Sequence, residues 1–308
     1  MEIIVNQDAE LIANETSSQQ DVENDVVLLP RGLALSPAET YPITSRENSN
    51  FTVIIGGAGC GKTTLVTSLY QMFLKGSFGN YLFAGSQTLS AFEDRAFHTR
   101  LKSNRKNPET PRTERNSLDS ILHLRLSKDG RKVNLLLSDF SGEDYNDIIA
   151  NIDAVKDNFG IISSAQKLML VIDGERLLSI RYRREEVQKV MDIFQTIYDA
   201  NLLNPTSKTL IAISKYDLIK KDQNEAKIRL YINSILPQFR EKFSSIANNI
   251  SFCEVAAMPA NENNVAMGYG LDKVLVFLTD CEREYAIISD QQDTVSQFDL
   301  YSERTKNE

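Results

Sequence analysis

The sequence predicts an α/β fold, with a mostly parallel twisted sheet, helices on both of its faces and one antiparallel strand pair. Apolar runs alternate with helical patterns across residues 51–287, which is typical of parallel sheets covered on both faces. Two strand-like runs, 120–128 and 132–144, flank Lys128-Asp129-Gly130, a sequence that favours a hairpin turn. No segment repeats, so we expect a single domain over residues 27–287.

Apolar spacing indicates the elements of the first half. Residues 27–50 are expected to form an ordered lead-in, and residues 51–57 (FTVIIGG) a buried strand that ends in glycines. Residues 63–76 follow as a helix that ends at Gly76. Residues 80–94 predict a short strand, a turn and the start of a helix. Residues 101–116 are polar and predict a loop.

The second half alternates in the same way. Residues 145–165 have the periodicity of an amphipathic helix pair, and residues 167–175 form a buried strand. The chain then predicts helix 185–200, strand 209–219, helix 226–245 on either side of Pro237, strand 250–258 and helix 271–287.

Charge and cysteine usage restrict the class of protein. The net charge of −8 argues against general coating of nucleic acid. Three scattered cysteines, Cys60, Cys253 and Cys281, form no CxxC or Cys/His cluster, which argues against structural zinc and fits a reducing cytoplasm. The N-terminus lacks a signal-peptide pattern, and no apolar stretch has the length of a membrane helix. We therefore expect a cytoplasmic protein without membrane attachment.

Charge is spread unevenly along the chain. Residues 1–26 are polar and lack periodicity, which predicts a flexible acidic N-terminal arm, and residues 288–308 predict a polar C-terminal tail. Residues 95–115 are rich in arginine and lysine. This basic segment is a solvated loop, a surface for an acidic partner, or a surface for the acidic residues of 1–50, and the sequence leaves these alternatives open.

Residues 54–65 (IIGGAGCGKTTL) contain the pattern G-x-x-x-x-G-K-[ST] between a predicted strand and a predicted helix. Backbone N–H groups of such a P-loop surround phosphate oxygens, and the helix N-terminus adds partial positive charge. We expect Lys62 to reach the β- and γ-phosphates and the Thr63 hydroxyl to bind Mg²⁺. The nucleotide-contacting residues expected here are Gly57, Ala58, Gly59, Cys60, Gly61, Lys62, Thr63 and Thr64.

Two later strand ends add polar motifs. Asp139-Phe140-Ser141-Gly142 is a D-x-x-G sequence, in which Asp139 is expected near Mg²⁺ and the Gly142 N–H near the γ-phosphate. Ser214-Lys215-Tyr216-Asp217 resembles the [N/T]-K-x-D motif of guanine-nucleotide-binding proteins, with Ser214 in place of Asn or Thr. The Asp217 carboxylate can accept hydrogen bonds from the guanine ring N–H and amino group, and the Lys215 stem can lie over the base.

The order of these three motifs resembles the translation-factor-related (TRAFAC) class of P-loop GTPases. More specifically, residues 83–95, 110–113 and 135–145 resemble the bacterial double-GTPase group, second type, and the resemblance covers residues 28–285. It implies a P-loop NTPase G-domain that binds GTP or GDP with Mg²⁺, with Ala257 in the base loop. It also implies a protein effector or second GTPase from a neighbouring gene, in a setting of biological conflict such as phage defence.

Three residues outside the P-loop bear on hydrolysis. Many GTPases of the class have a water-orienting glutamine after D-x-x-G, where this chain has Glu143. A glutamate cannot donate to phosphate as an amide does, so we expect slow intrinsic turnover; alternatively, Glu143 only caps the following helix. Thr113 matches the class threonine on Mg²⁺ and the γ-phosphate, with Thr110 and Thr88 as competitors. Arg112 beside it is a candidate arginine finger in cis.

The sequence thus predicts a Mg²⁺-dependent GTPase that switches through residues 83–115 and 139–160. One alternative is a nucleotide-gated scaffold with little hydrolysis. Another is a P-loop ATPase or kinase, which leaves the S-K-x-D motif unexplained. His123 has no partner at ligand spacing and is expected to be structural, and residues 179–186 (SIRYRREE) are expected to begin a solvated helix. No direct contact with nucleic acid is expected.

Overall fold

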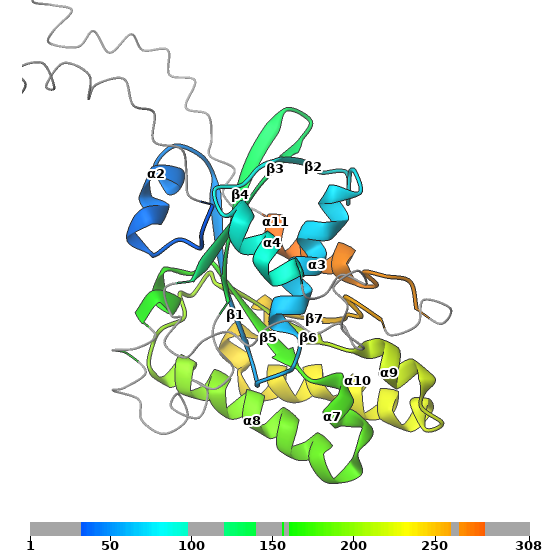
Figure 1. Cartoon of the computed structure of the whole chain (residues 1–308). Coiled ribbons are helices and arrows are strands. Elements are labelled where there is room, and N and C mark those ends of the chain that lie inside the picture. Colours follow the sequence, from blue (N-terminus) through cyan, green and yellow to red (C-terminus); the bar gives the residue numbers. More distant parts are fainter. Residues whose placement is uncertain (1–31, 98–119, 140–155, 157–159, 260–264, 281–308) are drawn as a thin grey trace, which may run out of the picture.

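The computed structural model describes residues 32–97, 120–139, 156, 160–259 and 265–280. In these residues a seven-stranded sheet has the order β2-β3-β4-β1-β5-β6-β7, with β1 at its centre (Figure 1). The strands are β1 Ser49–Gly56, β2 Leu82–Gly85, β3 Ile121–Lys128, β4 Arg131–Asp139, β5 Lys167–Ile172, β6 Lys208–Ile213 and β7 Ile250–Glu254.

The sheet is mostly parallel, as predicted. Strands β4, β1, β5, β6 and β7 run in one direction. The β3–β4 hairpin is confirmed, and positive φ angles at Asp129 (50°) and Gly130 (77°) form its tight turn. Strand β3 also pairs antiparallel with the short edge strand β2, so the antiparallel part of the sheet extends one strand further than predicted.

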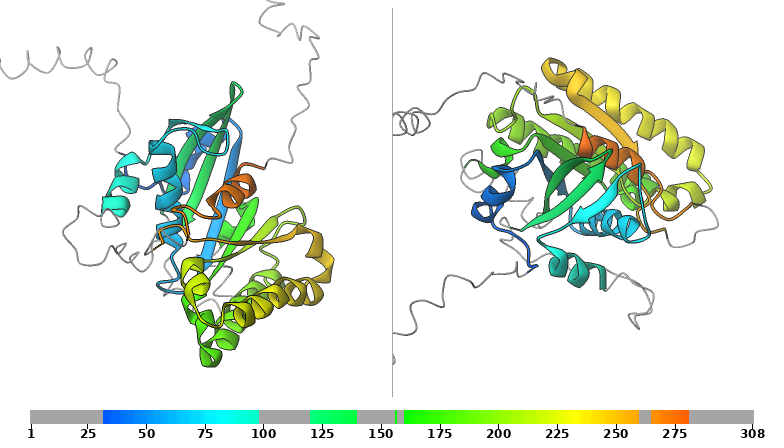
Figure 2. Two further views of the ribbon diagram at one scale, coloured as in Figure 1. Left: turned by 90° about the vertical axis from the view of Figure 1, so that its right-hand side faces the viewer. Right: turned by 90° about the horizontal axis from the view of Figure 1, so that it is seen from above.

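Helices cover both faces of the sheet, and Figure 2 gives two further views of this arrangement. The α-helices are α2 Tyr41–Thr44, α3 Lys62–Leu74, α4 Leu89–Phe97, α7 Gly174–Leu178, α8 Ile180–Asp199, α9 Tyr216–Lys221, α10 Glu225–Lys242 and α11 Leu271–Thr279. The 3₁₀ turns are η2 Ala38–Thr40, η4 Gly160–Ser164 and η5 Ser244–Asn249.

The alternating side chains of the buried strands supply two hydrophobic cores, one on each face. Helices α8 and α10 close the first core, where the Phe194 and Phe243 rings meet edge to face at 4.6 Å. Helices α3, α4 and α11 close the second core, where the Tyr70 and Phe92 rings stack at 4.8 Å. Burial on both faces explains why β5 is apolar along most of its length.

Three predicted strands end earlier than expected. Strand β6 stops at Ile213 and not at residue 219, because Lys215 has a left-handed backbone (φ 49°, ψ 37°) and the chain then turns into α9. Strand β5 stops at Ile172 because Asp173 caps α7, its Oδ1 accepting the Glu175 N–H at 3.0 Å. Strand β7 stops at Glu254, and the residues after it contact β6 and α9.

Helices α8 and α11 differ in extent from the prediction. Helix α11 ends at Thr279 and not at residue 287, because the backbone of Asp280 is extended (φ −63°, ψ 111°). Helix α8 begins at Ile180, so residues 179–186 do begin a helix, and the Ile180 side chain is 82% exposed. Helix α10 is helical on both sides of Pro237, as predicted, and runs continuously through it. Among the described helices, none is long and apolar enough to span a membrane.

The lead-in before β1 is ordered where the structure describes it. Leu35 and Ile121 exchange two backbone hydrogen bonds of 2.9 Å, and Ile43 is buried in the first core. The arm at 1–26, the loop at 101–116, the tail at 288–308 and most of the helix pair at 145–165 lie outside the described residues. The proposed domain limits therefore stay predictions.

Candidate nucleotide-binding site

The P-loop connects the carboxyl end of the central strand β1 to helix α3. Gly59 and Gly61 have positive φ angles of 74° and 93°, a conformation that favours glycine. A Cβ on Gly56 would lie 2.5 Å from Cys60 Sγ and 2.8 Å from the Val171 carbonyl oxygen, so only glycine fits there. The loop is therefore shaped by its own glycines and by its packing against β5.

The side chain of Lys62 lies along this loop. It is 5% exposed, and its Nζ donates to the Gly56 carbonyl at 2.7 Å and to the Gly57 carbonyl at 3.3 Å. Thr63 and Thr64 follow in the first turn of α3, both half-buried. A buried ammonium at the N-terminus of a 13-residue helix, beside exposed loop residues Ala58 and Gly59, fits a nucleotide phosphate tail.

Cys60 contributes to the loop through its backbone, whose N–H donates to the Gly57 carbonyl at 3.3 Å, and through its side chain, which packs against Gly56. Its side chain is buried, and burial raises the pKa of the thiol to about 11, although the nearby Lys62 ammonium partly lowers it. The thiol therefore stays protonated at neutral pH and is a poor nucleophile.

The S-K-x-D turn at the end of β6 lies beside the P-loop. A Cβ on Gly61 would be 3.9 Å from the Ser214 Cβ. Ser214 is buried, and its Oγ donates to the Ile172 carbonyl at 3.2 Å. Asp217 is 4% exposed and lies in the first turn of α9. The fold thus brings two motifs from distant parts of the sequence to the same edge of the sheet.

The segment after β7 also reaches this edge. The Tyr216 N–H donates to the Val255 carbonyl at 3.1 Å, and the Tyr216 and Tyr269 rings stack at 5.8 Å. Ala256 N–H donates to the Tyr269 carbonyl at 3.0 Å, and Ala257, the candidate base-loop residue, is half-buried next to it. Ala257 therefore follows directly on residues that contact the S-K-x-D turn.

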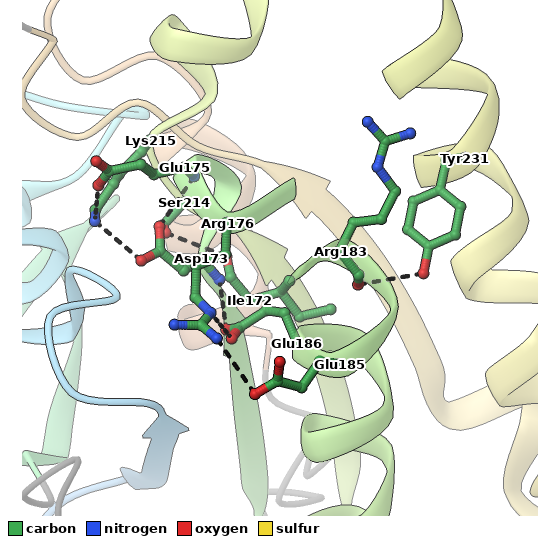
Figure 3. A network of polar contacts seen from close by, with 10 residues as sticks. All are labelled: Ile172, Asp173, Glu175, Arg176, Arg183, Glu185, Glu186, Ser214, Lys215 and Tyr231. Carbon is green, nitrogen blue, oxygen red and sulfur yellow. Dashed lines mark hydrogen bonds and ion pairs between the residues drawn. The ribbon is translucent and has the colours of Figure 1, made fainter. Parts of the chain in front are cut away.

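A network of charged side chains joins the turn after β5 to the S-K-x-D turn (Figure 3). Lys215 Nζ lies 3.0 Å from Asp173 Oδ2 and 2.8 Å from Glu175 Oε2. Burial lowers the pKa of Lys215, but its hydrogen bonds and charge interactions with these two carboxylates outweigh burial, so the pKa is raised. Our sequence analysis missed Asp173 and Glu175, although an acidic Asp-Gly-Glu sequence directly after a buried strand was a usable signal.

A second pair of charges supports Asp173. The Glu186 side chain accepts the Asp173 N–H at 3.2 Å and forms an ion pair with Arg176, with Nε and Oε2 2.9 Å apart. Glu186 is 6% exposed, and burial raises its pKa, although the Asp173 N–H and Arg176 act in the opposite direction.

The candidate Mg²⁺ residues are only partly described. Asp139 ends β4, and its Cα pairs with Ile54 in the neighbouring strand β1, but its side chain lies outside the described residues. The expected residues Gly142, Glu143, Arg112 and Thr113 also lie outside them. In the part of the chain that the structure describes, no group of three or more His, Cys, Asp or Glu side chains is arranged to hold a metal ion.

Thr88, the competitor of Thr113, has a structural role. It is fully buried, and its Oγ1 accepts the His123 N–H at 2.9 Å. His123 is itself buried between the Gln87 N–H, which donates to its Nδ1 at 3.0 Å, and Asn134 Oδ1, 2.9 Å from its Nε2. The expectation that His123 is structural is confirmed.

A glycine-rich loop that leads from the central strand of a mostly parallel α/β sheet into a helix defines a P-loop NTPase fold, consistent with a GTPase domain. The chain belongs to the Double-GTPase 2 (DO-GTPase2) family, whose model matches residues 50–304. This membership confirms the resemblance to the double-GTPase group of the second type, and it indicates a GTP-binding GTPase. No curated protein matches the chain.

Proposed function

We propose that the protein is a Mg²⁺-dependent GTPase that acts as a molecular switch. The observation that carries this proposal is the close approach of the P-loop and the S-K-x-D turn, with 3.9 Å between a Cβ built on Gly61 and the Ser214 Cβ. One motif is suited to a phosphate tail and the other to guanine, so a single nucleotide can reach both.

Each residue of the site has a distinct role in this proposal. Backbone N–H groups of residues 57–64 and the Lys62 ammonium bind the phosphates, and the buried Asp217 carboxylate accepts the two guanine N–H donors. Thr63 and Asp139 would hold Mg²⁺. When bound, the ion offsets the negative charge on the β- and γ-phosphates.

Hydrolysis depends on residues beyond the P-loop. We assign Glu143 to the attacking water, Thr113 to the Mg²⁺ side of the γ-phosphate, and Arg112 to the charge that develops in the transition state. Arginine fingers of this kind contribute about 10³–10⁵ in rate. The glutamate in place of glutamine favours a second candidate function, a nucleotide-gated scaffold with little turnover.

Phosphate release from GTP tests the proposal and separates the two candidates. The full chain is assayed with GTP and with ATP, with Mg²⁺ and with EDTA, beside the Lys62→Ala variant. The proposal expects Mg²⁺-dependent release from GTP that Lys62→Ala abolishes, and a faster rate in Glu143→Gln. Tight GTP binding without release in any of these samples would favour the scaffold instead.

We propose that the partner is a protein effector or a second GTPase encoded by a neighbouring gene, in a cytoplasmic conflict or phage-defence system. The resemblance to the double-GTPase group supports the partner and its setting. The scattered cysteines, two of them free and buried in the described residues, are consistent with a reducing compartment. Co-expression of the neighbouring gene product with this chain, followed by size-exclusion chromatography with GTP or GDP, tests the pairing.

A further inference from the structure

The turn between β5 and α7 carries two carboxylates that belong to none of the nucleotide motifs. Asp173 is almost fully buried, with 9% of its side chain exposed, whereas Glu175 is 60% exposed. Both carboxylates form ion pairs with the ammonium of Lys215, Asp173 at 3.0 Å and Glu175 at 2.8 Å. Figure 3 shows the three side chains facing one another. Lys215 is the second residue of the S-K-x-D motif.

Asp173 is itself held in place by neighbouring groups. One carboxylate oxygen caps α7 through the Glu175 N–H at 3.0 Å, which leaves the other oxygen to accept from Lys215. The Asp173 N–H donates to Glu186 Oε1, and the other carboxylate oxygen of Glu186 forms an ion pair with Arg176 Nε at 2.9 Å. Because the cap and the Glu186 contact fix both its backbone and its side chain, Asp173 gives the lysine a rigid anchor.

The backbones of the two turns are also in direct contact. The Gly174 N–H donates to the Ser214 carbonyl at 3.2 Å, and a Cβ on Gly174 would lie only 2.1 Å from that oxygen. Helices α7 and α9, which follow the two turns, pack against each other. The separation between Asp173 and the S-K-x-D motif is therefore fixed by the backbone as well as by the ion pair.

A lysine side chain has a flexible four-carbon stem and loses much conformational freedom when it is ordered. If its ammonium is already anchored, the alkyl stem is ordered before a nucleotide arrives. Nucleotide binding is then not weakened by the loss of the stem's conformational entropy. We propose that Asp173 and Glu175 are positioning residues of the guanine site, which hold the Lys215 ammonium so that the alkyl stem lies over the base. This inference rests on the proposed function, because it requires a guanine nucleotide at the S-K-x-D turn.

The test compares two ligands that share a phosphate tail. GDP or GTP contacts both the P-loop and Lys215, whereas inorganic tripolyphosphate has no base and engages the P-loop alone. Asp173→Asn keeps the α7 cap, since asparagine is as good an N-cap as aspartate, but it replaces the oxygen that accepts from Lys215 with an NH2 group that cannot accept. Glu185→Gln is the matched control, because Glu185 is an exposed carboxylate that pairs with Arg176 at 3.5 Å and is not among the Lys215 contacts.

The double variant Asp173→Asn/Glu175→Gln is expected to bind GTP and GDP about tenfold more weakly, equivalent to about 1.4 kcal/mol. Its affinity for tripolyphosphate and the affinities of Glu185→Gln are expected to match the wild type. In a Lys215→Ala background the two substitutions should have no further effect on GTP affinity, because they act through the lysine.

Three outcomes would overturn the inference. Unchanged or tighter GTP binding by the double variant would show that the carboxylates do not pre-order the lysine for the base. Equal weakening for GTP and tripolyphosphate would indicate general damage to the site. A full effect that persists without Lys215 would mean that the carboxylates act by another route. If instead the proposed function were wrong, the wild type itself would bind ATP as tightly as GTP, a result that none of these three outcomes includes.

Discussion

Gly174 offers a direct perturbation of the contact between the turn after β5 and the S-K-x-D turn. In Gly174→Ala, the new Cβ would lie 2.1 Å from the Ser214 carbonyl oxygen and 3.2 Å from Ile219 Cδ1. One turn must move by about 0.9 Å to bring the Cβ and the oxygen to 3.0 Å, the shortest separation that real structures tolerate. The movement also weakens the 3.2 Å hydrogen bond between the Gly174 N–H and Ser214.

The expected cost follows from these two losses. Overpacking of a well-packed site costs about 1–3 kcal/mol, and a lost backbone hydrogen bond costs about 1 kcal/mol. We expect Gly174→Ala to lower the free energy of unfolding by about 2–4 kcal/mol. Because Ser214 moves together with Lys215 and Asp217, we also expect GDP affinity to fall at least tenfold, since a displacement of about 1 Å at a positioned group can cost about 100-fold.

Gly160→Ala is the matched control. Gly160 begins η4, has no positive φ, and a Cβ added there would meet nothing within 4 Å among the described residues. Urea unfolding of wild type and both variants, followed by circular dichroism, measures stability, and fluorescent GDP titration measures affinity. Gly160→Ala should stay within about 0.5 kcal/mol of wild type. If Gly174→Ala matched Gly160→Ala in both measurements, the close approach of Gly174 to Ser214 would not be what holds the two turns in place.

Two further predictions concern buried titratable groups. Because burial raises the pKa of Cys60 to about 11, alkylation of this thiol at neutral pH should be far slower in the native protein than in urea; mass spectrometry of the alkylated peptide measures it, and equal rates would contradict the burial. Burial lowers the pKa of His123 below its ordinary 6.5, against the opposing bond to Asn134, so its contribution to stability is present above pH 6.5 and is lost as the pH falls toward the lowered pKa. From about pH 7.5 to about pH 5.5, the wild type should therefore lose more unfolding free energy than His123→Gln does, and equal losses in urea titrations would show that His123 does not carry the effect.

Features with local determinants were predicted well from the sequence. The P-loop depends on glycines, a lysine and hydroxyls within one short segment, and the β3–β4 turn on Asp129 and Gly130 alone. The end of β6 was predicted wrongly, because Tyr216, Leu218 and Ile219 prolong the apolar run. The left-handed backbone of Lys215 and the bond from the Tyr216 N–H to the Val255 carbonyl, a tertiary contact, turn this segment into α9.

The charged network around Lys215 could not be derived from spacing. Asp173 and Glu175 lie some 40 residues before the lysine in the chain, and parallel pairing of β5 with β6 brings them together. The carboxyl ends of successive parallel strands meet at one edge of a sheet, and the closeness of Gly61 to Ser214 follows that rule. Which Asp173 oxygen faces the lysine depends on the α7 cap, which uses the other oxygen and forms only in the folded chain.

We propose that this site selects guanine nucleotides through Asp217. Competition of unlabelled GTP, ATP and XTP against a fluorescent nucleotide analogue, for wild type and Asp217→Asn, measures this selectivity. We predict that GTP displaces the analogue from wild type while ATP does not. For Asp217→Asn, measured against a fluorescent XDP analogue, we predict that preference shifts toward XTP, because the xanthine ring offers a carbonyl where guanine has an amino group. Equal competition by ATP, or an unchanged preference in Asp217→Asn, would contradict the account.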